Sequence, residues 1–245
     1  MTKTPAPTDQ SASAATAATG PVFRLDLPHG RCVGLRIPSA EADTNPGLPA
    51  AEWEFLASLP SGRRASFASG RRALRQAFAD LGMPITEPLL PLPLPRGGPA
   101  LPAGALGSIS HKRTLAVGLA AIQPVGAPAA ALGVDLEEIR PLKVDLGRRV
   151  LTPSEREMQA SLPREHQDEF VLERFSLKEA FYKAVNGFVG PDVSFQALEI
   201  TDIRPSGEVI WSAPLLEQFG LRGEGWVHRP TTGFLLTSVF VETAP

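Results

Sequence analysis

The chain has 245 residues, of which 43% are apolar, enough for one large domain or two small ones. A formal net charge of −2 gives no general reason to expect nucleic-acid binding, and no apolar run approaches the roughly 20 residues of a membrane span. The single cysteine, Cys32, excludes an intramolecular disulfide and suits a reducing, cytoplasmic environment.

The chain begins with a segment that we expect to be disordered, before the N-terminal half. Residues 1–20 are rich in Ala, Thr and Ser and lack the apolar core of a signal peptide. Apolar periodicity then predicts two short strands joined by a turn, followed by two helices. These elements are expected at residues 22–27, 32–37, 51–58 and 63–81.

The second of these helices carries several arginines. Arg64 and Arg71 are seven residues apart, and Arg71 and Arg75 are four apart, so all three can lie on one helix face. Such a face is either a solvated basic surface or a site for an anion, and the spacing alone does not choose between them.

A proline-rich stretch separates this helix from the next strands. Seven prolines fall among residues 84–102, which excludes a regular helix or a central strand there. The sequence then leads through 106–110 to His111, and residues 115–122 and 129–136 are apolar runs that favour strands.

The C-terminal half contains a strong helix start. Thr152 as N-cap, Pro153 at the first helical position and Glu155 three residues after the cap predict a short helix that ends near Ser161. A long helix is expected from residue 163 or 164 to 185, with Asn186-Gly187 as its stop. Closing strands are expected at 193–201, 207–212, 225–229 and 234–241. The pattern predicts a mixed α+β fold with two halves of similar length, 21–122 and 123–245.

Two carboxylates follow one of the apolar runs. Asp135 and Glu137 are separated by one residue, so a strand would point both side chains to the same face. Solvated carboxylates at a strand end are the ordinary explanation; the alternative is oxygen ligation of a hard cation such as Mg2+.

The long helix carries the other notable charges. Glu179 and Lys183 are four apart and share a face, with Lys178 beside them. An ordinary Glu–Lys pair of this kind contributes roughly 0.2–0.5 kcal/mol. Here, however, Phe175 and Phe181 leave little polar face, and charges among aromatic side chains usually have a specific partner.

A third polar group surrounds His111. Ser108 and Ser110 precede it, and Lys112 and Arg113 follow it, so the local charge is positive and could bind a phosphate. The sequence contains no P-loop, no Cys/His cluster for zinc and no G-x-S-x-G nucleophile motif.

Together these residues resemble the 4′-phosphopantetheinyl transferases of the single-chain, pseudo-dimeric class, in the enterobactin-synthase-type branch. Four blocks carry the resemblance, in the family's order: Gly70-Arg71 with Arg75; Gly98-Pro99 and Pro102 leading to Gly107-Ser108-Ile109-Ser110-His111; Gly133-Val134-Asp135-Leu136-Glu137; and Phe175-Ser176-x-Lys178-Glu179-Ala180-x-x-Lys183.

The resemblance implies a pseudo-two-fold fold of two α/β subdomains in one chain. It also implies that coenzyme A donates its phosphopantetheine arm to a serine of an apo acyl or peptidyl carrier protein, with release of 3′,5′-ADP. The expected enzyme is a cytoplasmic monomer that depends on Mg2+, with Mn2+ as the alternative ion.

The same resemblance assigns roles to residues. Asp135, Glu137 and Glu179 would hold the metal, and Glu179 or a metal-bound water would be the base. Lys183 would contact the pyrophosphate and Lys178 the transferring phosphate. Coenzyme contacts are expected from Arg64, Arg71, Arg75, Ser110 and His111. Basic side chains that could face an acidic carrier are Arg72, Lys112 and Arg113.

Two other functions share these residues. A magnesium-dependent hydrolase of a diphosphate such as coenzyme A would use the same carboxylates without a carrier. A non-catalytic module could bind the carrier or the coenzyme, although the intact carboxylates and Lys183 argue against it.

Overall fold

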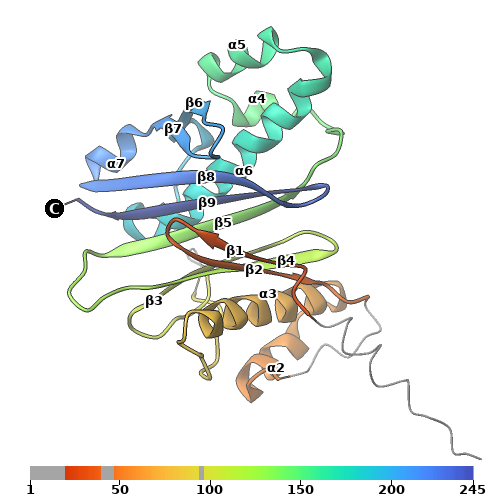
Figure 1. Ribbon diagram of the computed structural model, residues 1–245, viewed down its shortest axis with the longest axis vertical. Helices are drawn as coiled ribbons and strands as arrows, with labels where there is room; N and C mark the ends of the chain where they lie inside the picture. Colours follow the sequence, from red (N-terminus) through yellow and green to blue (C-terminus); the bar gives the residue numbers. More distant parts are fainter. Residues whose placement is uncertain (1–19, 40–46, 94–96, 245) are drawn as a thin grey trace, which may run out of the picture.

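The computed structural model describes residues 20–39, 47–93 and 97–244, so the expected N-terminal tail lies outside the described residues except for Gly20. The first half contains an antiparallel sheet in the order β1-β2-β4-β3 and two helices (Figure 1). Its elements are β1 (Phe23–Leu27), β2 (Gly30–Arg36), α2 (Ala50–Ser58), α3 (Ser61–Asp80), β3 (Ala105–His111) and β4 (Leu115–Ile122).

The second half contains a three-stranded antiparallel sheet in the order β5-β9-β8, and a separate two-stranded sheet of β6 and β7. Its elements are β5 (Ala130–Glu138), α4 (Gly147–Val150), α5 (Pro153–Ser161), α6 (Arg164–Val189), the 3-10 turn η1 (Phe195–Ala197), β6 (Glu199–Ile203), β7 (Val209–Ser212), α7 (Pro214–Gln218), β8 (Leu221–Thr231) and β9 (Phe234–Thr243).

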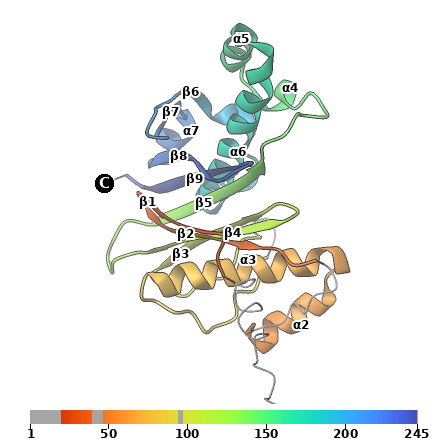
Figure 2. The same ribbon diagram turned by 45° about the vertical axis from the view of Figure 1, so that its right-hand side comes forward.

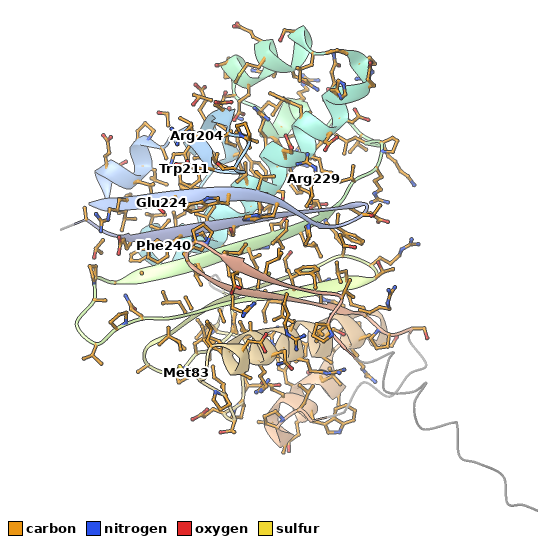
Figure 3. The ribbon with its side chains drawn as sticks, in the orientation of Figure 1. Met83, Arg204, Trp211, Glu224, Arg229 and Phe240 are labelled. Carbon is orange, nitrogen blue, oxygen red and sulfur yellow. The ribbon has the colours of Figure 1, made fainter. Side chains whose placement is uncertain are left out.

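The two main sheets face each other between two long helices, as Figure 2 shows. Leu119 of β4, Val134 of β5 and Leu236 of β9 belong to one buried cluster between the sheets. Separate clusters join α3 to the first sheet and α6 to the second. Phe240 of β9, which Figure 3 labels, lies at one end of the sheets. Its ring stacks on that of His29 in the β1–β2 turn.

Each long helix lies close to its sheet at a glycine. A Cβ at Gly118 of β4 would lie 2.3 Å from the backbone nitrogen of Leu74 in α3. A Cβ at Gly133 of β5 would lie 1.8 Å from the carbonyl oxygen of Ala180 in α6. Both contacts exclude any larger residue, because the helix backbone occupies the space of the side chain.

Most expected elements are confirmed within a few residues, including the capping box in which Thr152 and Glu155 bond reciprocally. Two expectations were wrong. The long helix continues through Asn186 and ends at Gly190, whose φ of 85° suits a glycine terminator. Residues 193–201 are not one strand, because the Ser194 hydroxyl accepts a bond from the Gln196 N–H and begins the turn η1 before β6.

The proline-rich stretch forms neither a helix nor a regular strand in its described part, residues 84–93 and 97–102. None of the helices in the described residues is long and apolar enough to cross a bilayer.

Candidate functional site

The candidate site lies where the edges of the two main sheets meet, at β3 and β5. The Ser108 hydroxyl accepts a hydrogen bond of 3.0 Å from the Val134 N–H, and the Ser110 hydroxyl accepts one of 3.3 Å from the Leu136 N–H. Edge-strand N–H groups need such partners when they are buried. The two serines therefore join β3 to β5, a role that the sequence did not indicate.

Asp135 is the centre of the polar contacts at this junction. One of its oxygens accepts hydrogen bonds from Ser110 Oγ at 2.9 Å and from Lys183 Nζ at 2.9 Å. The other oxygen accepts one from Ser176 Oγ at 3.0 Å, and Ser176 also contacts Thr237 Oγ1 at 2.9 Å. The Asp135 carboxylate is thus fixed by side chains from β3 and α6, with β9 supporting Ser176.

Two further carboxylates have raised pKa values. Burial raises the pKa of Glu137; its hydrogen bond with Lys112 opposes the rise, and the Asp135 carboxylate adds to it. Burial also raises the pKa of Glu179, and Asp135 again adds to the rise. Among the described residues, Glu179 has no hydrogen-bond partner, so its oxygens are available to a proton or a ligand.

These carboxylates have the chemistry of a magnesium site, although they are not gathered around a common point. Carboxylate oxygens are ligands that Mg2+ prefers, and mutual repulsion of Glu137 and Glu179 with Asp135 would be relieved by a cation. Lys112 Nζ lies 2.6 Å from Glu137, and Lys183 Nζ lies 2.9 Å from Asp135. No set of three or more His, Cys, Asp or Glu side chains in the described ranges could hold a metal ion as placed. The metal assignment stays a prediction.

His111 lies at the end of β3 in a field of positive charge. Burial lowers the pKa of His111 from its ordinary value, and Arg63, Lys183, Lys112 and Arg71 each lower it further. Four cations around one imidazole would all be favoured by a bound phosphate. The sequence did not single out Arg63, because the helix face was defined from Arg64 and its seven-residue spacing to Arg71. Arg63, Phe67 and Arg71 follow one another at intervals of four residues, and that spacing would have placed Arg63 on the same helix face as Arg71.

Arg71 connects this positive field to the proline-rich stretch. Its guanidinium lies over the Phe67 ring, 4.0 Å from the centroid, and its Nε donates to the Leu89 carbonyl at 3.1 Å. Burial lowers the pKa of Arg71 to about 10, with Glu52 opposing that effect. The side chain is thus a cation at neutral pH with little contact with water.

Two other arginines have partners within the protein. Arg64 donates to carbonyl oxygens of Ala57 and Leu59, where α2 ends. Arg75 pairs with Glu52 at 2.7 Å. These contacts account for both arginines without a bound coenzyme, and their predicted coenzyme contacts stay untested.

Lys178 is buried, with a side chain that is 1% exposed. Its ammonium donates to Glu155 at 2.6 Å and to the Val150 carbonyl at 2.9 Å. Burial lowers the pKa of Lys178, and Glu155 opposes that shift. These contacts place Lys178 between α4, α5 and α6, where it supports the helix that carries Glu179.

A cavity of about 200 Å³ adjoins Lys183. The proline-rich stretch contributes Leu92, Gly98, Pro99 and Leu101 to its lining, and the remaining walls come from β3, β5 and α6. An elongated ligand with a phosphate near Lys183 could therefore extend along the proline-rich stretch.

Comparison with known proteins assigns both halves to the same family. Residues 131–222 match the model of the 4′-phosphopantetheinyl transferase superfamily, and residues 51–121 match the 4′-phosphopantetheinyl transferase N-terminal domain. The chain is 38% identical over 141 residues to the 4′-phosphopantetheinyl transferase Svp of Streptomyces mobaraensis, an alignment that covers 55% of this chain but only about half (52%) of the relative.

A second curated relative is covered more fully. The chain is 33% identical over 87 residues to a holo-[acyl-carrier-protein] synthase of Bacillus cytotoxicus, which is 33% of this chain and 73% of that protein. A solved holo-(acyl-carrier-protein) synthase from Bacillus anthracis, in complex with coenzyme A (3′,5′-ADP), is 26% identical, with a TM-score of 0.35 over 46% of this chain and 96% of that one. Because this TM-score is below 0.5, the assignment depends on the sequence matches.

Proposed function

This chain belongs to the 4′-phosphopantetheinyl transferase superfamily, and from that premise we propose that it modifies an apo acyl or peptidyl carrier protein. A serine oxygen of the carrier forms a bond to the β-phosphorus of coenzyme A. The bond from that phosphorus to the bridging oxygen breaks, 3′,5′-ADP leaves, and the serine proton passes to a base. The observation that best supports this function is that Asp135, Glu179 and Lys183 meet at one junction, beside the positive charges around His111.

The contacts support a proposed role for each of these residues. Glu179 is the proton acceptor, because its raised pKa favours proton uptake and its oxygens have no partner in the described part of the chain. Lys183 donates a hydrogen bond to Asp135 in the free protein, and it would also donate one to a phosphate oxygen of bound coenzyme A. His111 and Arg71 would bind the 3′-phosphate. Lys178 supports the site from within the protein.

Magnesium would complete this arrangement. Bound by Asp135, Glu137 and Glu179, the ion would supply positive charge to neutralise the pyrophosphate. Manganese is the alternative ion.

The finer assignments belong to the same proposal. The two halves, 21–122 and 123–245, each pair a main sheet with a long helix, which supports a pseudo-two-fold arrangement. The motif blocks support the enterobactin-synthase-type branch. We propose a monomer that acts in the cytoplasm.

Basic residues near the junction would face an acidic carrier. Lys112 is partly exposed beside Glu137, and Arg113 follows it as an exposed residue. Arg72, by contrast, lines a separate hollow with Pro21 and Leu35. The carrier surface is therefore proposed around Lys112 and Arg113.

Release of 3′,5′-ADP in the presence and absence of an apo carrier tests this function. We expect release only with a carrier that retains its serine. Asp135→Asn should lower the rate at least about 100-fold, whereas the exposed control Asp26→Asn should not. Release that needs no carrier would instead establish the hydrolase.

A further inference from the structure

The proline-rich segment, residues 84–93 and 97–102, is folded back on itself. It begins just after Met83, which Figure 3 places below the sheets. The Leu92 N–H donates to the Gly98 carbonyl at 2.7 Å, and the Ala100 N–H donates to the Leu90 carbonyl at 2.8 Å. These bonds close the segment at one end, but its prolines supply no N–H groups with which to join a sheet.

Glu52 of α2 holds the other end of this segment. Its side chain is 0% exposed, and it accepts a bidentate pair of bonds from Arg75 at 3.0 and 2.7 Å. The same carboxylate accepts the Leu89 N–H. Arg75 in turn donates to the Glu87 carbonyl at 2.7 Å. One buried ion pair between α2 and α3 therefore binds the segment at two backbone positions.

A gain in stability does not by itself explain why this ion pair is buried. Desolvation of the two charges offsets most of their attraction, so apolar residues of similar volume often serve as well. The Glu52–Arg75 pair provides what apolar side chains cannot, which is hydrogen bonds to the backbone of Glu87 and Leu89. Those groups have no strand or helix ladder to join.

The position fixed in this way is next to the candidate site. Leu89 is held on both sides, because its N–H donates to Glu52 and its carbonyl accepts from Arg71. Arg71 also contributes to the positive field at His111. A few residues further on, Leu92 forms part of the cavity that adjoins Lys183.

We propose that Glu52 and Arg75 are positioning residues that hold the proline-rich segment in place as one wall of the coenzyme A pocket. The proposal depends on the proposed function for the identity of the ligand. Arg75 then acts through the segment, not by contact with a coenzyme phosphate.

The test uses the full chain with Glu52→Gln. Glutamine keeps the volume and the acceptor for the Leu89 N–H but removes the charge that Arg75 needs. We expect the Kd of coenzyme A from calorimetry, and its KM in the transfer assay, to rise about tenfold, with kcat changed by less than about twofold. Amide hydrogen exchange should become faster in residues 84–93 and stay unchanged in α6.

The control is Glu242→Gln, which removes the same group from the exposed pair with Arg222 in the second sheet. It should leave exchange in 84–93 and coenzyme affinity unchanged. If Glu52→Gln does not fold, Glu52→Gln combined with Arg75→Met removes both charges and is measured in its place. In the wild type, coenzyme A should slow exchange in residues 84–93.

Three results would overturn the positioning role. They are faster exchange in 84–93 with unchanged coenzyme affinity, weaker affinity with unchanged exchange, or no protection of 84–93 by coenzyme A in a wild type that binds it. A wild type that neither binds coenzyme A nor modifies a carrier would refute the proposed function instead.

Discussion

At the scale of single residues, His111 is the group whose charge state should respond most to the coenzyme. In the free protein, burial and four neighbouring cations lower its pKa from the ordinary value, which favours the neutral imidazole. A bound phosphate dianion would raise that pKa, because it favours the imidazolium. Coenzyme binding should therefore be coupled to proton uptake at His111.

The sign of the pH dependence follows from this coupling. The pKa of His111 is higher in the complex than in the free protein. The affinity that protonated His111 adds is therefore complete at pH values below the pKa of the free protein, and it is lost as pH rises through the pKa of the complex. Affinity for coenzyme A should fall with rising pH more steeply than affinity for the 3′-dephospho form. His111→Gln should raise the Kd about tenfold at acidic pH and flatten the profile, and the exposed control His166→Gln should do neither.

Calorimetric titrations at several pH values, with both coenzymes, would measure this effect. Equal pH profiles for coenzyme A and its 3′-dephospho form would refute the role of His111 at the 3′-phosphate.

At the scale of elements, α6 carries two polar groups with different tasks. Glu179 and Lys183 lie at the junction of β3 and β5, because Gly133 lets the helix backbone approach β5 at Ala180. Lys178 instead pairs with Glu155, the residue that caps α5. The same short motif therefore provides two residues of the candidate site and one buried ion pair that joins α6 to α5.

Replacement of Lys178 by Met should reduce stability, with little direct effect on chemistry. It leaves Glu155, which is 0% exposed, without its cation, and loss of one partner from a buried pair costs about 3–5 kcal/mol. Denaturant unfolding should show this loss, and Lys143→Met at an exposed position should change the free energy of unfolding by less than about 0.5 kcal/mol. A stable Lys178→Met protein with a large fall in kcat would contradict this assignment and favour a contact with substrate.

Local sequence signals predicted much of this architecture. The Thr152–Glu155 capping box and the 115–122 strand were predicted within a residue, because cap chemistry and apolar runs depend on neighbours in the chain. The end of α6 was not, because burial of Asn186 and packing of Phe188 on the core outweigh the Asn-Gly stop signal.

In the candidate site, too, some features could be predicted from the sequence and others could not. Spacing left the roles of Asp135 and Lys183 open and the family resemblance assigned both to the site; the structure brings their side chains within 2.9 Å. Spacing could not reveal that Arg75 pairs with Glu52, or Lys178 with Glu155, because each partner lies 23 residues away in the chain. A basic helix face is the same in sequence whether its charges bind a ligand or a buried carboxylate.

At the scale of the whole molecule, the two halves share one interior. The cluster between the sheets contains Val117 and Leu119 from the first half and Val134 and Leu236 from the second. The site lies on this shared interface, so its geometry depends on the halves remaining together. We therefore expect both halves to unfold in one cooperative transition.

Ser108→Ala tests that dependence. The change leaves the buried Val134 N–H without its acceptor, which costs about 1–3 kcal/mol. The thermal midpoint should fall by several degrees while circular dichroism and tryptophan fluorescence still report one transition. Ser66→Ala, on the outer part of α3, provides the control. Two separate transitions in the wild type would show that the halves are independent.

The central claim is tested most directly by the intact mass of an apo carrier protein after incubation with this enzyme, coenzyme A and Mg2+, beside a sample with EDTA. The account predicts a carrier heavier by one phosphopantetheine arm, and no increase with EDTA or with Glu179→Gln. An unmodified mass across acyl and peptidyl carriers, with folded enzyme that binds coenzyme A, would contradict it.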